Sequence, residues 1–185
     1  MIKFFILVIG LLPLVRLVVL GFQDDLTANP IEFITRSTGT WALVFLCITL
    51  AITPLRRYTG WNQLIQYRRM LGLFVFFYAL LHFSSWFWLD HNLSLQEMWQ
   101  DVLKRPFITL GFIAFLCLWP LALTSNQWAL RKLKRRWGQL HRLVYLVAIL
   151  VILHYFWHKS GKNDFQEVGI YAVIISSLLL LRLKK

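Results

Sequence analysis

Three of the five histidines in the chain, His82, His141 and His154, lie in hydrophobic segments long enough to cross a lipid bilayer. Ionisable side chains are costly inside a membrane, so their presence there indicates a functional site. Two neutral imidazoles that face each other inside a helical bundle can supply both axial ligands of a haem iron. These histidines therefore predict a membrane electron carrier.

Two of the three histidines can be placed at nearly the same depth. His82 follows Arg69 by 13 residues, about 20 Å of helix, and His154 follows Arg142 by 12 residues, about 18 Å. Both helices enter the membrane from the same side, so their imidazoles can oppose each other across the bundle axis. We therefore predict one haem b with His82 and His154 as its axial ligands and its iron as the bound metal.

His141 lies 13 residues before His154, at the predicted cytoplasmic edge. The separation suits a second redox centre, but the corresponding depth on the other helix holds Arg68 and Arg69 instead of a histidine. These arginines could hold a flavin phosphate or haem propionates. Two interpretations of His141 stay open: a ligand of a second haem, a flavin or a quinone, and an interfacial histidine without a ligand.

The sequence also predicts the surroundings of three other polar residues, His91, His158 and Arg16. His91 begins a loop and is predicted to be solvated. His158 follows His154 by four residues on the same helical face, at or beyond the membrane edge, where it could touch a haem propionate or a partner protein. Arg16 is predicted either to snorkel out of the first segment or to pair with an anion such as a propionate.

The composition indicates a membrane protein. Of 185 residues, 58% are hydrophobic and only 15% are charged, and the mean hydropathy is +0.61. We predict an all-α, multi-pass bundle of six transmembrane helices forming a single domain over residues 1–185, because about 20 apolar residues cross a bilayer. The predicted spans are Phe4–Phe22, Trp41–Leu55, Met70–Leu89, Phe107–Leu123, Leu143–Trp157 and Val168–Leu183.

Charge segregation predicts the topology. Basic residues fill the loops after the second and fourth spans and both chain ends, including Arg182, Lys184 and Lys185, whereas all eight acids fall in the three alternate loops. By the positive-inside rule, both termini are cytoplasmic. Topology and contact with anionic lipid explain the net charge of +12, so no nucleic acid partner is predicted.

Missing motifs restrict the chemistry. There is no C-x-x-C-H motif, and Cys47 and Cys117 lie within predicted spans, so any haem is predicted to be non-covalent. There is no G-x-G-x-x-G motif or P-loop either. The chain is therefore predicted to receive electrons from a separate donor and to leave catalysis to a partner.

Several stretches together resemble a known family: TPLRRYTG, YRRMLGLFVFFYALLHFSSW, KRPFITLGF, and LTSNQWALRKLKRRWGQLHRLVYLVAIL followed by HYFW. They are similar to MsrQ (formerly YedZ), the haem-binding membrane subunits of periplasmic methionine sulfoxide reductase systems, which belong to the ferric-reductase-like transmembrane domains. The family's haem histidines fall on His82, His141 and His154. NADPH oxidases of the wider superfamily carry two histidines on the third helix, whereas this chain has one.

The resemblance implies a six-helix haem b protein of the bacterial inner membrane that also binds FMN. It would pass electrons from the quinone pool or a cytosolic flavin reductase to MsrP, a periplasmic molybdopterin enzyme that reduces methionine sulfoxide in oxidised proteins. Two alternatives stay open. One is a quinone-linked cytochrome b or metal reductase with another partner. The other is a transporter with histidines in a proton or metal path, for which inverted repeats or broken helices are typical, and we expect no repeat from this sequence.

Overall fold

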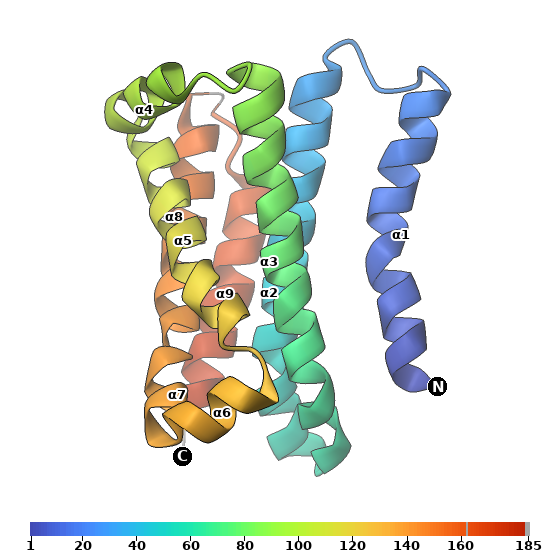
Figure 1. Cartoon of the computed structure of the whole chain (residues 1–185), viewed down its shortest axis with the longest axis vertical. Coiled ribbons are helices and arrows are strands. Elements are labelled where there is room, and N and C mark those ends of the chain that lie inside the picture. Colours follow the sequence, from blue (N-terminus) through green and yellow to red (C-terminus); the bar gives the residue numbers. More distant parts are fainter. Residues whose placement is uncertain (162, 184–185) are drawn as a thin grey trace.

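The computed structural model describes residues 1–161 and 163–183, with the backbone alone for Leu183, and within these residues all regular structure is helical, as predicted. Figure 1 shows the long helices running side by side, with short helices across both ends of the bundle. In chain order the elements are α1 (Ile2–Phe22), α2 (Pro30–Thr59), η1 (Asn62–Tyr67), α3 (Arg68–Ser85), η2 (Trp86–Asp90), α4 (Leu95–Lys104), α5 (Pro106–Leu123), α6 (Gln127–Leu133), α7 (Arg135–Leu140), α8 (Leu143–Ser160) and α9 (Gln166–Leu183).

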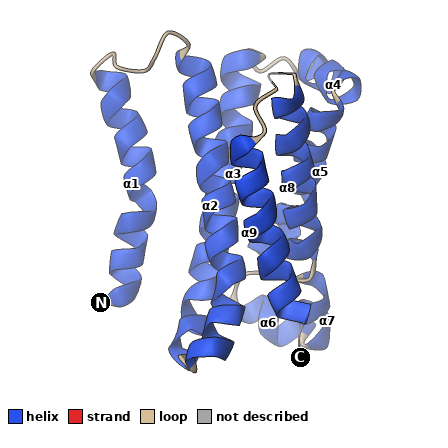
Figure 2. Cartoon of the chain, turned by 180° about the vertical axis from the view of Figure 1, so that it is seen from behind, coloured by secondary structure: helices blue, strands red, loops and turns tan. Residues whose placement is uncertain are grey.

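The chain is a multi-pass membrane protein. In the described part, five segments are long and apolar enough to cross a bilayer: Ile2–Phe22, Pro30–Thr59, Asn62–Asp90, Pro106–Leu123 and Arg135–Ser160. They contain the first five predicted spans. The sixth predicted span coincides with α9, which is not among these five but runs alongside α2 and α8 (Figure 2).

Helix α2 begins well before the predicted start at Trp41. The Asn29 side chain caps it by accepting a hydrogen bond from the backbone N–H of Glu32 at 3.2 Å, and Pro30 occupies the first helical position. Gly60 ends the helix in the left-handed conformation, with φ at 74°. The residues of its first turns are polar, so the sequence did not predict this extension. Thr35, Arg36 and Gly39 in the extension line the cavity described below.

The two ends of the bundle differ in charge. Helix α4 lies across one end, here called the α4 end, and α6 and α7 lie across the opposite, α7 end (Figure 1). All eight acids belong to segments at the α4 end. Met1 and the last described turn of α9 lie at the α7 end, so the chain crosses the bundle an even number of times. Lys184 and Lys185, predicted to be cytoplasmic cations, lie outside the described residues.

Helix α1 stands apart from the other long helices in both views (Figures 1 and 2). The Tyr78 hydroxyl of α3 reaches across to donate a hydrogen bond to the Gly10 carbonyl at 2.6 Å. A Cβ at Gly10 would collide with the Phe74 ring, so the absence of a side chain there permits the contact. Arg16 is exposed on this helix and does not line the cavity described below.

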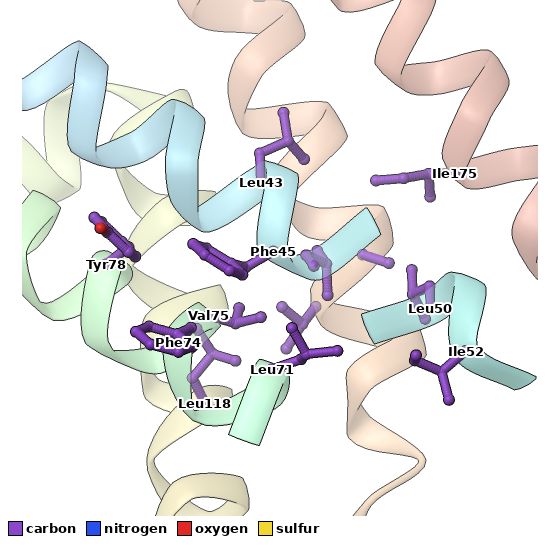
Figure 3. Packing of buried hydrophobic residues seen from close by; sticks show 13 residues of the cluster. Leu43, Phe45, Leu50, Ile52, Leu71, Phe74, Val75, Tyr78, Leu118 and Ile175 are labelled. Atoms are coloured by element: carbon purple, nitrogen blue, oxygen red, sulfur yellow. The ribbon is translucent and has the colours of Figure 1, made fainter. Parts of the chain in front are cut away.

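The buried core lies mainly between α2 and α3, as Figure 3 shows. The ring of Phe45 stacks on Phe74 with centroids 4.9 Å apart and on Tyr78 at 5.4 Å. Large apolar side chains also cover the outside of the bundle, such as Leu116 at 50% and Val173 at 68% exposure. Such a surface suits lipid and would be unfavourable in water.

Proline in α2 creates a backbone defect that α9 fills. Pro54 has no N–H, so the Leu50 carbonyl, four residues earlier, lacks its helical donor. The guanidinium of Arg182 donates to that carbonyl at 2.7 and 2.9 Å and to the Thr49 carbonyl at 3.1 Å. It also lies 5.7 Å from the centre of the Tyr145 ring. Arg182 therefore joins α9 to α2 and α8.

We predict that Arg182→Gln lowers the free energy of unfolding by about 1–3 kcal/mol, because it leaves a buried carbonyl without a donor. In a Pro54→Ala background, residue 54 regains an N–H for the Leu50 carbonyl, so the same substitution should cost less. Unfolding in detergent micelles of the wild type, Arg182→Gln, Pro54→Ala and the double variant measures this difference. Arg57→Gln is the control, since its bond to the Leu181 carbonyl is exposed and 3.4 Å long. An equal loss in both backgrounds would contradict the role assigned to Pro54.

Candidate functional site

A cavity of about 510 Å³ lies between α2, α3, α5 and α8. Its deep part is apolar, and its polar residues gather at the α4 end. The residues that line it include Thr35, Arg36, Gly39, Ala42, Leu43, Leu46, Val75, Ala79, His82, Phe83, Trp86, Asp90, Arg105, Phe107, Gly111, Ala114, Phe115, Leu118, Val147, Val151, His154, Tyr155, His158 and Glu167.

The structure brings His82 and His154 together across this cavity. Their ring centroids are 6.1 Å apart, and the ring planes are nearly perpendicular, at 79°. Each ring is held by a neighbouring helix: the Nδ1 of His82 lies 2.7 Å from the Thr35 carbonyl, and the Nδ1 of His154 lies 2.6 Å from the Phe107 carbonyl. The predicted matching depth of these two histidines is therefore reproduced.

The hydrogen bonds determine the tautomer of both rings. A carbonyl oxygen can only accept, so Nδ1 must carry the proton in His82 and in His154. In a neutral imidazole this leaves Nε2 as the only nitrogen with a free lone pair. Both residues line the cavity, so Nε2 is the atom of each ring that could bind a ligand there.

This arrangement fits a haem. Two neutral imidazoles whose ring centres lie 6.1 Å apart, both lining one apolar cavity, are the donor set that would hold a haem iron. Among the described residues, no group of three or more His, Cys, Asp or Glu side chains could hold a bare metal ion. Two imidazoles suffice for a haem because the porphyrin supplies the other four ligands.

Charged side chains surround the cavity at the α4 end. Arg36 pairs with Glu32 at 3.3 Å, and Arg105 pairs with Asp101 at 2.8 Å. His158 also lines the cavity, with its ring 5.5 Å from that of Phe107. The α4 end is therefore the side on which polar groups of a bound molecule would meet partners.

The prediction that His91 is solvated is wrong. Its side chain is only 13% exposed, because α4 folds back over it. The Nε2 atom lies 3.3 Å from an Asp101 carboxylate oxygen, and the ring packs 4.7 Å from the ring of Trp86. His91 thus fastens α4 to the bundle and does not line the cavity.

His141 lies away from the cavity, at the α7 end between α7 and α8. Its ring stacks on Trp137 with centroids 3.9 Å apart, and its Nε2 lies 3.0 Å from the Thr124 hydroxyl oxygen. That hydroxyl donates its proton to the Pro120 carbonyl at 2.6 Å, so it accepts from Nε2–H and leaves Nδ1 as the free lone pair. Arg68 and Arg69 occupy the first turn of α3 at the same end.

Sequence reasoning missed the groups that orient the two facing histidines. The acceptors are backbone carbonyls, which have no residue-type signature. The close contacts of Gly39 with the His82 ring and of Gly111 with the His154 ring were missed as well. The available signal was the equal spacing of 43 residues between Gly39 and His82 and between Gly111 and His154.

A helical membrane bundle with two imidazoles facing each other in an apolar cavity is the construction of a membrane cytochrome. Residues 38–152 match the family model described as ferric reductase like transmembrane component. No solved structure matches the chain.

Comparison with named relatives places the chain more specifically within this family. The chain is 56% identical over 98% of its length to a protein of Herminiimonas arsenicoxydans, covering 84% of that protein. It is 58% identical to one of Ralstonia nicotianae, over 94% of this chain and 81% of the relative, and 56% identical to one of Bordetella pertussis, over 96% and 86%. Each is named protein-methionine-sulfoxide reductase heme-binding subunit MsrQ. The chain belongs to the MsrQ family of haem-binding subunits, within the ferric-reductase-like transmembrane proteins.

Proposed function

We propose that the chain carries electrons across the bacterial inner membrane through a haem b held by His82 and His154. The donor would be the quinone pool or a cytosolic flavin reductase. The acceptor would be an MsrP-like periplasmic molybdoenzyme, which repairs methionine sulfoxide in oxidised proteins and performs the catalytic step. The 6.1 Å separation of the two imidazoles carries this proposal, and the names of the relatives support the methionine sulfoxide reductase partner.

In this function the protein supplies the ligands and the surroundings of the cofactor. When bound, haem supplies a one-electron ferric/ferrous couple. His82 and His154 would hold it through Nε2, and the Thr35 and Phe107 carbonyls, which accept from Nδ1, fix the orientation of the rings. The apolar lining excludes water, which keeps the couple away from competing reactions.

We predict that His82→Ala or His154→Ala removes most of the bound haem while the protein stays in the membrane, because each substitution removes one of the two imidazoles that would hold it. Reduced-minus-oxidised spectra of purified protein, normalised to protein content, measure the loss. His91→Ala is the control, since His91 lies outside the cavity lining. A full low-spin spectrum in either cavity variant would contradict the ligand assignment, and a wild-type protein without a haem spectrum would favour the transporter alternative.

The proposed direction of transfer requires a topology. We propose that residues 1–185 form one domain, that α9 is a sixth membrane span and that the α7 end faces the cytoplasm. The acids at the α4 end and the basic run of Arg131, Lys132, Lys134, Arg135 and Arg136 near the α7 end support this orientation.

Reporter fusions test the topology. Fusions after the C-terminus and near Lys132 should report a cytoplasmic location, whereas fusions near Gln96 and Asn163 should report an external one, because the positive-inside rule retains the basic loops. Alkaline phosphatase and a fluorescent reporter at the same positions give opposite signals and control for expression. An external C-terminus would refute the orientation if the fusions near Lys132, Gln96 and Asn163 are inverted as well, and would refute the sixth span if they are not.

We also propose an electron entry point around His141. A haem at the depth of His82 and His154 lies about 20 Å from the cytoplasmic boundary by helix rise, a long distance for direct transfer from a cytosolic donor. A flavin such as FMN, a quinone or a second haem near His141 would divide this distance into shorter electron-transfer steps. The free Nδ1 of His141 and the cations Arg68 and Arg69 support such a site.

We predict that His141→Ala slows reduction by quinol and by reduced flavin about tenfold or more while leaving the haem at His82 and His154 in place, because only the entry step is affected. Stopped-flow absorbance with each donor measures the rate. Thr124→Val is the matched control, because it removes the hydrogen bond to Nε2 but keeps the imidazole. Wild-type rates with both donors at full haem occupancy would show that His141 is an interfacial residue.

A further inference from the structure

The two histidine sites are built in the same way. In each, Nδ1 donates to the carbonyl of the residue 47 positions earlier, Thr35 for His82 and Phe107 for His154. In each, the residue four positions after that carbonyl is a glycine whose nearest neighbours are atoms of the imidazole. One carbonyl, one glycine and one histidine thus form a unit that occurs twice.

The similarity extends to further residues of the two helix pairs, α2 with α3 and α5 with α8. Several residues recur at the same separation in sequence as His82 and His154, and line the cavity from both sides: Ala42 with Ala114, Leu46 with Leu118, and Val75 with Val147. Helices α2 and α5 both start at the α4 end, and α3 and α8 both return to it (Figure 1). The cavity therefore lies between two parallel copies of one helix pair, and our expectation of no repeat was wrong. The parallel sense differs from the inverted repeats of many transporters.

Geometry explains why glycine occurs in both copies. A helical carbonyl points along the axis toward the residue four positions later, so a ring that bonds to it lies over that residue. A Cβ at Gly39 would come within 3.0 Å of the His82 Nδ1, and one at Gly111 within 2.7 Å of the His154 Nδ1. Any side chain would push the ring away from its carbonyl. Glycine is otherwise unfavourable in a helix interior.

We propose that Gly39 and Gly111 are positioning residues of the haem site. By letting each imidazole rest on the opposite helix, they preserve the Nδ1–H···O=C bonds and thereby set the separation of the rings and the basicity of each Nε2. A more basic imidazole stabilises ferric iron, so these bonds lower the reduction potential of a bound haem. The inference rests on the proposed function, because it takes His82 and His154 as the ligands.

The test compares Gly39→Ala and Gly111→Ala with Gly72→Ala, whose Cβ would meet only Thr49 at an ordinary 3.9 Å. We expect Gly111→Ala to lose more than half of its haem per protein, since its contact is shorter than any real Cβ tolerates. Gly39→Ala should keep its haem but show a higher midpoint potential in a redox titration, because the weakened hydrogen bond makes the ring less basic. Gly72→Ala should match the wild type in both measurements.

Haem content, low-spin spectrum and midpoint potential equal to those of Gly72→Ala in both variants would overturn the proposal. Immunoblots of the membranes normalise each value to the protein present. If Gly111→Ala does not accumulate, the potential of Gly39→Ala, whose contact is milder, decides the question. Failure of the proposed function gives a different pattern, in which His82→Ala and His154→Ala retain a full haem spectrum.

Discussion

Inside a bilayer there is no water to satisfy a polar group, so each one needs a partner within the protein. This constraint governs the structure. The Nδ1 atoms of His82 and His154 reach carbonyls on adjacent helices, Tyr78 reaches a carbonyl of α1, and Arg182 reaches the carbonyl that Pro54 leaves without a donor. In every case a side chain on one helix satisfies the backbone of another. The bonds that remove the cost of burying polar groups are therefore also the bonds that arrange the helices.

The same constraint makes the site rigid. A helical carbonyl already accepts one hydrogen bond from its own helix and has a second lone pair to offer. The imidazole must come very close to the backbone to use that lone pair, and only a residue without a side chain leaves the room. The close contact then fixes the ring on a regular helix, which holds a ligand more firmly than a loop. The absence of a side chain at Gly39 and Gly111 thus determines where the two imidazoles lie in the cavity.

Local properties made part of this structure predictable. Hydropathy reports the spans directly, and a fixed rise per residue converts the distance between Arg69 and His82 into a depth. Contacts between helices across the bundle were harder to predict from the sequence. The polar start of α2 does not look like a span, the burial of His91 depends on how α4 folds back, and backbone acceptors leave no mark on residue type. The repeat was hard to see because its two copies share few residues besides those that line the cavity.

The two helix pairs agree in the cavity and differ at its ends. At the α7 end the position of His141 in one pair corresponds to Arg69 in the other, and at the α4 end that of His158 corresponds to Trp86. A centre with equivalent ligands on both sides cannot by itself give electron transfer a direction. In the proposed function, the direction must come from the ends, where cations and the His141 region face one compartment and the acidic rim faces the other. In the proposed function, the duplicated centre would hold the cofactor, and the unlike ends would distinguish the donor from the acceptor.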